Sequence, residues 1–287
     1  MKSLHLTANR LRHHLLEWGS GERIVLLLHG FLEHAHVWEL VAPGLAAAGL
    51  HVYALDWRGH GDSEWIGAGG YYHFADYVAD LDGIVRGLGG RAALVAHSMG
   101  GNAAVLYTGT MPERVSKLVS IEGLGPPDSN PATTPERYAT WIADVERTAA
   151  RVRPAFSAAD GLARMRERYP RMSEAALALL FEHGTRAEGE GRVWKFDPLH
   201  QTRSPQPYYA AQGRAFWQRV ACPVLYIEGD ESWVRLPDLD ERLGILRAER
   251  ATIRGSAHHP QLEQPEQLVE VLVEFLGRTV VGRSGGL

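Results

Sequence analysis

A serine flanked by small residues is the strongest candidate for chemistry in the sequence. Ser98 lies between an apolar run and a helix-forming run, with Ala96 and Gly100 two positions to either side. A serine at a sharp strand-to-helix turn needs small neighbours there, because the backbone is strained and adjacent strands crowd it. The first amides of the following helix also favour developing negative charge. The segment predicts Ser98 as a nucleophile; an incidental serine in a glycine-containing loop is the alternative.

Three further polar motifs come directly after short apolar runs. They are His-Gly-Phe at 29–31, Asp-Trp-Arg-Gly-His-Gly-Asp-Ser at 56–63 and Gly-Ser-Ala-His-His-Pro at 255–260. The glycines of the second motif suit a tight turn. Each motif, like the segment around Ser98, stands at the end of a predicted strand.

The elements that must position these motifs follow from the hydrophobic pattern. Apolar runs alternate with helix-length segments, and this spacing predicts a parallel sheet with helices on both faces. The predicted strands are 24–28, 52–55, 92–96, 118–121, 223–227 and 251–253, and the predicted helices include 74–88, 101–111 and 265–277.

The strand rhythm stops after residue 125 and returns near residue 223. Residues 135–185 are rich in Ala, Leu, Arg and Glu with helical periodicity, and 193–196 form at most a short extended piece. We therefore expect an α/β core domain at 1–125 and 216–287, interrupted by a mostly helical insertion at 126–215. The Gly-rich tail after 277 is expected to be disordered.

Composition excludes several classes of protein. The 287 residues carry 30 Lys and Arg against 34 Asp and Glu, which gives a net charge of −4. This charge argues against a nucleic-acid-binding protein, which would carry a basic domain or surface stripe. No segment has the apolar length of a transmembrane helix, and the N-terminus lacks a signal-peptide pattern. The single cysteine, Cys222, cannot form an internal disulfide and indicates a reducing compartment. We expect a cytoplasmic protein that does not insert into membranes.

These motifs and their order resemble the α/β-hydrolase superfamily, in its esterase- and lipase-like branch with a helical cap, over residues 20–277. The resemblance implies Ser98 as nucleophile and His258 as base, with the amides of Phe31 and Met99 as the oxyanion hole. It also implies that the insertion is the cap. Two glycines usual in the family are replaced by alanine, at Ala96 and Ala257. His259, beside the expected base, is the alternative base.

The acid that would orient the histidine departs from the family's pattern. The family commonly reads Gly-x-x-Asp after the strand at 223–227, but here Ser232 occupies the acid position. Some branches place the acid after the preceding core strand instead, where Glu122 stands, and its extra methylene suits the longer reach. Glu122 is therefore the expected acid, and Asp230 is the alternative.

The resemblance implies a two-step acyl transfer that needs no metal or organic cofactor. The expected substrate is a small to medium, largely apolar carboxylic ester. The candidate substrate-binding residues are His29, Trp38, Trp141 and Trp233. Alternatives on the same fold are a carbon–carbon bond hydrolase, a cofactor-free haloperoxidase and a non-catalytic ligand receptor. Epoxide hydrolases and dehalogenases are disfavoured because those branches carry aspartate where Ser98 stands. The oligomeric state stays open.

Overall fold

The computed structural model describes residues 1–150 and 154–278, so the Gly-rich tail lies largely outside the described residues. Within them, one eight-stranded sheet has the order β1-β2-β4-β3-β5-β6-β9-β10. Strands β3 to β10 of this sheet run parallel, whereas β1 pairs antiparallel with β2, and β2 antiparallel with β4. The strands are β1 (Lys2–Ala8), β2 (Leu11–Trp18), β3 (Ile24–Leu28), β4 (His51–Leu55), β5 (Ala92–His97), β6 (Val115–Ile121), β9 (Val224–Gly229) and β10 (Glu249–Ile253).

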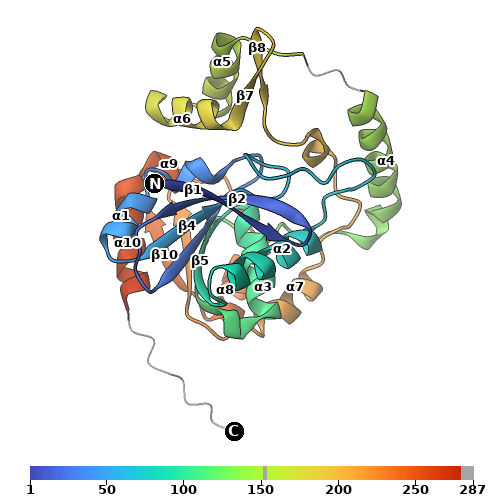
Figure 1. The fold of residues 1–287 in the computed structure, drawn as a ribbon. Coiled ribbons are helices and arrows are strands. Elements are labelled where there is room, and N and C mark those ends of the chain that lie inside the picture. The colour runs from blue at the N-terminus through green and yellow to red at the C-terminus, as the bar shows by residue number, and fades with distance from the viewer. Residues whose placement is uncertain (151–153, 279–287) are drawn as a thin grey trace.

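The predicted α/β architecture is confirmed. Strands such as β3, with the sequence IVLLL, are buried on both faces, because helices cover both sides of the sheet (Figure 1). One layer contains α2 (Phe74–Gly87), α3 (Met99–Thr110), α7 (Ala210–Trp217) and α8 (Leu239–Leu246). The other contains α1 (Ala42–Ala47), α9 (Pro260–Glu263) and α10 (Pro265–Gly277). Short 3-10 turns η1 (Ala35–Trp38) and η2 (Pro112–Arg114) complete the core.

The antiparallel hairpin β1–β2 was not predicted from the sequence. β1 alternates exposed and half-buried positions, so it shows no continuous apolar run. The turn between the strands uses Asn9 and Arg10 at φ values of 46° and 67°, without the glycine that usually marks a hairpin. The hairpin adds an antiparallel edge to an otherwise parallel sheet.

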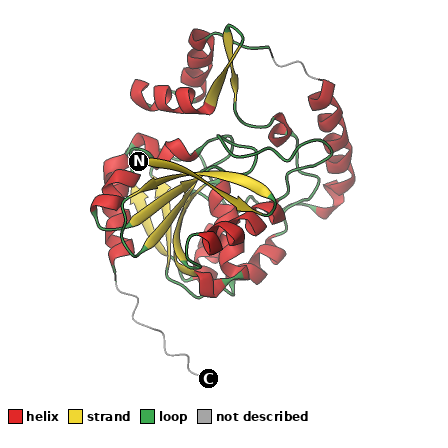
Figure 2. Ribbon diagram, in the orientation of Figure 1, coloured by secondary structure: helices red, strands yellow, loops and turns green. Residues whose placement is uncertain are grey.

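A mostly helical segment lies above the carboxyl ends of the parallel strands (Figures 1 and 2). It contains η3 (Pro131–Thr133), α4 (Thr134–Ala150), α5 (Ala158–Arg168), α6 (Glu174–Gly184), the antiparallel strands β7 (Thr185–Glu188) and β8 (Gly191–Trp194), and η4 (Pro198–Gln201). It contacts the core where His34 Nε2 lies 3.0 Å from the backbone oxygen of Leu180. The expected boundary at residue 215 needs correction, because it falls inside α7, which packs against α3.

Among the described residues, no helix combines the length and the apolar character that crossing a membrane requires.

Candidate active site

The backbone holds Ser98 in a conformation that few non-glycine residues adopt. Ser98 joins β5 to α3 with φ 50° and ψ −115°, and such strain persists only where the surroundings impose it. Here its N–H donates to the backbone oxygen of Ile121 at 2.8 Å. A Cβ added at Gly100 would lie 2.7 Å from the backbone oxygen of His29. The crowding explains why small residues flank this serine, as the sequence pattern indicated.

A histidine from the other end of the chain lies beside this serine. His258, on the loop after β10, places Nε2 at 3.1 Å from Ser98 Oγ, within hydrogen-bonding distance. The other ring nitrogen, Nδ1, lies 3.5 Å from Glu122 Oε2. This separation suits an ion pair but is longer than a formed hydrogen bond, a common state for catalytic groups without substrate. Ser98, His258 and Glu122 therefore form a line of contacts.

Glu122 is held in place by groups from the neighbouring strand β9 and the loop that follows it. It follows β6 directly, with a φ of 55°. Its Oε1 accepts a hydrogen bond from the N–H of Gly229 at 2.8 Å, and its Oε2 accepts one from Ser232 Oγ at 2.7 Å. Asp230, the alternative acid, is exposed and accepts from the N–H of Gly255 at 2.8 Å. The carboxylate that faces His258 is thus that of Glu122.

The surroundings keep the imidazole of His258 neutral at neutral pH. Burial lowers the pKa of His258 below its usual 6.5, and the nearby Glu122 opposes this effect only in part. A neutral imidazole with Nε2 directed at Ser98 can accept the hydroxyl proton. The geometry and the protonation state both suit a general base.

A second buried carboxylate, Glu33, lines the same cavity as His258, and the sequence reasoning missed it. Glu33 Oε2 accepts from the N–H of Gly30 at 2.7 Å and lies 3.2 Å from His97 Nδ1. Its Oε1 lies 3.2 Å from His259 Nε2, so His259 faces Glu33. His97 Nε2 in turn donates to the backbone oxygen of His258 at 2.7 Å.

These contacts also set the charge of His97. Burial lowers its pKa, but the attraction of Glu33 outweighs burial, so the pKa of His97 is raised above 6.5. Ring nitrogens of His97, His258 and His259 lie within 4.8 Å of one another, a spacing that could suit a metal ion. Glu33 and the His258 carbonyl already bind His97, so hydrogen bonding accounts for this cluster. Nothing in the spacing of Glu33 signals the role, because its histidine partners, His97 and His259, are more than 60 residues away.

Two cavities meet at Ser98 and Phe31. The first, of about 500 Å³, is called the catalytic cavity here; it is lined by His258, Trp233, Tyr169, Met172 and Arg168, among others. The second, of about 330 Å³, is called the aromatic cavity; it is lined by Met99, Trp141, Tyr71, Phe74 and Tyr77, among others. Two of the four expected substrate-binding residues, Trp141 and Trp233, thus border the space beside Ser98.

The other two, His29 and Trp38, are buried and border neither cavity, which corrects that expectation. The Nε2 of His29 accepts from the backbone N–H of Trp57 at 3.1 Å, and the Trp57 indole N–H donates to the His29 backbone oxygen at 3.0 Å. Trp38 lies in the hydrophobic core beneath α1. Both follow β3 closely in sequence, but their side chains turn inward.

Phe31 and Met99, the residues of the two expected oxyanion-hole amides, both line the aromatic cavity beside Ser98. Met99 opens α3 directly after Ser98, and an N–H in the first turn of a helix has no acceptor within that helix. Phe31 follows Gly30 on the loop after β3, and its side chain borders both cavities.

Comparisons with known proteins agree with this fold. The family model for the alpha/beta hydrolase fold matches residues 23–265. A probable serine hydrolase of Drosophila melanogaster is 25% identical over 90% of this chain and 82% of that protein. An esterase of Mycobacterium tuberculosis is 26% identical over 90% of this chain and 84% of that protein. The match to a serine hydrolase-like protein of Danio rerio, 36% identical, covers only 38% of this chain and 33% of that protein.

Solved structures show the same likeness. A hypothetical protein from Pseudomonas aeruginosa superposes with a TM-score of 0.88 at 26% identity, covering 97% of this chain and all of the other. A thioesterase domain from the curacin biosynthetic pathway gives 0.82 at 25% identity, covering 95% of this chain and 99% of the other. By its fold, its strand-to-helix serine and these matches, the chain belongs to the α/β-hydrolase fold family.

Proposed function

We propose that this protein is a serine hydrolase that cleaves carboxylic esters through an acyl-enzyme on Ser98. The observation that carries the proposal is the line of contacts from Ser98 Oγ through the His258 imidazole to Glu122, with separations of 3.1 and 3.5 Å. Relatives named as a probable serine hydrolase and an esterase support the same class of reaction.

In the first step, Ser98 Oγ attacks the ester carbonyl while His258 Nε2 accepts the hydroxyl proton. The carbonyl oxygen becomes negatively charged, and the N–H groups of Phe31 and Met99 stabilise it. His258 then gives its proton to the departing alcohol, which leaves an acyl group on Ser98. Glu122 keeps the proton of the neutral imidazole on Nδ1 and stabilises the charged form.

In the second step, water takes the place of the alcohol. His258 accepts a proton from this water as its oxygen attacks the acyl carbonyl. The tetrahedral intermediate collapses, Ser98 recovers its proton from His258, and the carboxylic acid leaves. Each proton is returned, so this cycle uses protein groups and water alone.

The two cavities beside Ser98 support a substrate with two sizeable groups. An ester bound at Ser98 could place one group in the catalytic cavity and the other in the aromatic cavity, which totals about 330 Å³. The aromatic side chains there favour an apolar group. The helical segment above the sheet contributes Trp141 to the wall of the aromatic cavity. We therefore propose that this segment acts as a cap over the site.

Ser98→Ala tests the proposal, measured on 4-nitrophenyl esters of increasing chain length and with a fluorophosphonate that labels activated serines. We expect turnover to fall to background and labelling to disappear, with an unchanged circular dichroism spectrum. Ser129→Ala is the control, because Ser129 lines neither of the two cavities. Labelling of a residue other than Ser98, or turnover in the Ser98→Ala variant, would overturn the proposal. No labelling of the wild type would favour a ligand receptor.

A further inference from the structure

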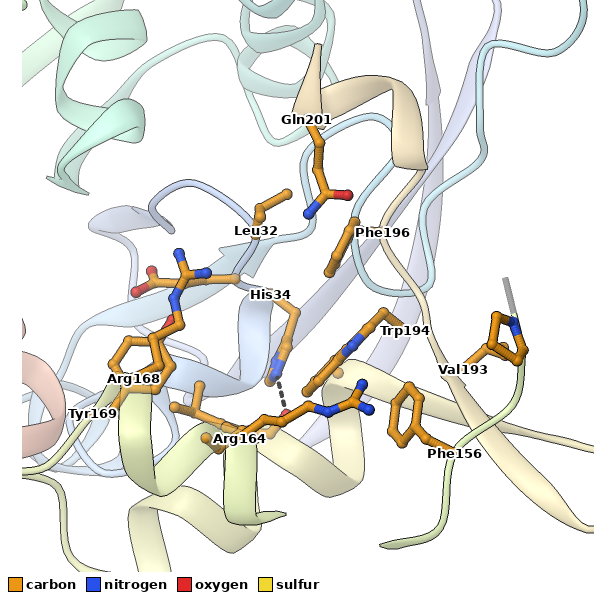
Figure 3. Close-up of a pocket in the computed structure, with 15 residues that line it drawn as sticks. Leu32, His34, Phe156, Arg164, Arg168, Tyr169, Val193, Trp194, Phe196 and Gln201 are labelled. Atoms are coloured by element: carbon orange, nitrogen blue, oxygen red, sulfur yellow. Dashed lines mark hydrogen bonds between the residues drawn. The ribbon is translucent and has the colours of Figure 1, made fainter. Parts of the chain in front are cut away.

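A third cavity, of about 510 Å³, lies beside the catalytic cavity and beneath α5 and α6. We call it the arginine cavity; its walls include Leu32, Phe156, Trp194, Phe196, Arg164 and Arg168. Glu33, Arg168 and Tyr169 line both this cavity and the one that contains Ser98. Figure 3 shows Arg168 beside Tyr169 at one edge, and Arg164 extending toward Phe156. The two spaces therefore adjoin at Arg168.

The arginines on and after α5 fall into two groups. Arg166 pairs with Glu174 at 2.7 Å, and Arg171 pairs with Glu231 at 2.6 Å. For Arg164 and Arg168, no carboxylate of the described residues, 1–150 and 154–278, lies within ion-pair distance. Each guanidinium instead lies 5.6 Å from an aromatic ring, that of Phe156 or Tyr169 respectively. Arg164 and Arg168, which border the cavities, can therefore bind an anionic group of a ligand.

Glu33, the carboxylate where the two cavities adjoin, does not neutralise the positive charge of Arg168. Its oxygens already contact the N–H of Gly30, the His97 ring and the His259 ring. Glu33 raises the pKa of His97 and so favours the protonated ring beside this carboxylate. Glu33 still lies close enough to repel a second negative charge, so a monovalent carboxylate fits this junction better than a divalent phosphate.

We propose that Arg168 binds a carboxylate on the acyl group of the substrate, so that the enzyme prefers hemiesters of dicarboxylic acids. The inference rests on the proposed ester hydrolysis at Ser98. A guanidinium binds a carboxylate through two parallel hydrogen bonds, which fixes orientation as well as charge. The chain between carboxylate and ester lies against Tyr169, and Arg164 serves as a second cation for longer chains. The sequence alone could not select one arginine from so many in this segment.

The test compares 4-nitrophenyl hemiesters of glutaric and adipic acid with their methyl-capped diesters of equal length, after subtraction of spontaneous hydrolysis. We expect the wild type to show a higher kcat/KM for the hemiesters. Arg168→Met should lower that value by about 5-fold if the pair stays solvated and by up to about 100-fold if it is desolvated. The diesters should change less than about twofold. Arg168→Lys should give an intermediate kcat/KM for the hemiesters, because lysine keeps the positive charge but cannot form the two parallel hydrogen bonds of a guanidinium.

Arg166→Met is the matched control, because Arg166 lies on the same helix but pairs with the exposed Glu174. This substitution should change kcat/KM neither for the hemiesters nor for the diesters. Equal kcat/KM values for hemiesters and diesters in the wild type would overturn the inference, and so would an equal loss of both in Arg168→Met. Neither result would affect the proposed hydrolysis at Ser98. Absence of all ester hydrolysis together with no labelling of Ser98 would overturn the proposed function and this inference with it.

Discussion

Replacing Glu122 by glutamine should disable the base without disturbing the fold. In the wild type, the Glu122 carboxylate accepts hydrogen bonds from the N–H of Gly229 and the hydroxyl of Ser232. A glutamine can keep one of these with its oxygen. When the oxygen stays on the Gly229 N–H, the NH₂ group takes the place of Oε2, 3.5 Å from His258 Nδ1. The NH₂ can only donate, so it favours a His258 tautomer that carries its proton on Nε2.

That tautomer cannot accept the proton of Ser98, and this sets the size of the effect. The corresponding change in a serine protease lowers kcat by about 10⁴. Because the 3.5 Å separation is longer than a formed hydrogen bond, we expect a loss of about 10² to 10⁴ here, or roughly 3 to 5 kcal/mol of barrier. The dissociation constant of an unreactive ester analogue should stay near the wild-type value. The Glu122 carboxylate binds Gly229, Ser232 and His258, and of these three residues only His258 lines a cavity.

The pH profile gives a second readout of the same change. Burial lowers the pKa of His258 and Glu122 partly restores it; removing the carboxylate should therefore lower this pKa further. Since the neutral imidazole is the active form, kcat/KM falls on the acid side as pH drops through this pKa. In Glu122→Gln, the acid limb of the residual activity should move to lower pH.

Asp230→Asn is the control, because Asp230 is exposed and its carboxylate accepts a hydrogen bond from the N–H of Gly255 and not from His258. This substitution should reduce kcat by less than about threefold. Our reasoning would be refuted if Asp230→Asn lost more activity than Glu122→Gln, or if Glu122→Gln left the acid limb in place while lowering kcat. The second result would indicate that Glu122 only supports the loop after β9.

Two further predictions concern buried carboxylates. Glu33→Gln should destabilise the protein by about 3 kcal/mol in urea unfolding, because it leaves His97 buried without its charged partner. The pKa of His97 is raised by Glu33, so this difference should be largest near pH 6 and shrink as pH rises through that pKa; a constant difference would contradict the assignment. Burial raises the pKa of Asp56, but His14 Nδ1, 2.7 Å from its carboxylate, and the N–H of Asp62, which donates to it at 2.9 Å, hold this pKa below the usual value. Wild-type stability should therefore fall as pH drops below about 4, and Asp56→Asn should be less stable at pH 7 but show a flatter acid limb in thermal melts.

The sequence predicted those parts of the fold that depend on local pattern. β5 is buried along its whole length and β3 at every position but its first, so their apolar runs are continuous and easily recognised. β2 is equally buried in its centre, but His13 and His14 stand there. These histidines are compatible with burial because Asp80 and Asp56 lie 3.6 and 2.7 Å away. Partners so distant in sequence leave no local signal.

Side-chain direction explains the errors around the site. The sequence places His29 and Trp38 soon after a strand that leads to the site, but it does not show that both turn into the core. Glu33, from the same loop, turns instead toward His97 and His259. Which arginine of α5 faces a cavity likewise depends on how that helix docks above the sheet (Figure 1). Such information lies in tertiary packing and not in the spacing of residues.

The proposed acid follows β6, and the serine that binds it follows the neighbouring strand β9. β6 and β9 are neighbours, with Ile121 beside Ile227, so the residues that follow them lie close together. Glu122 reaches His258 from the first strand end, and Ser232, 2.7 Å from its carboxylate, donates from the second. An acid at both positions would bring two negative charges into contact in a buried space, which is costly. A serine at position 232 is therefore the chemical complement of a glutamate at position 122.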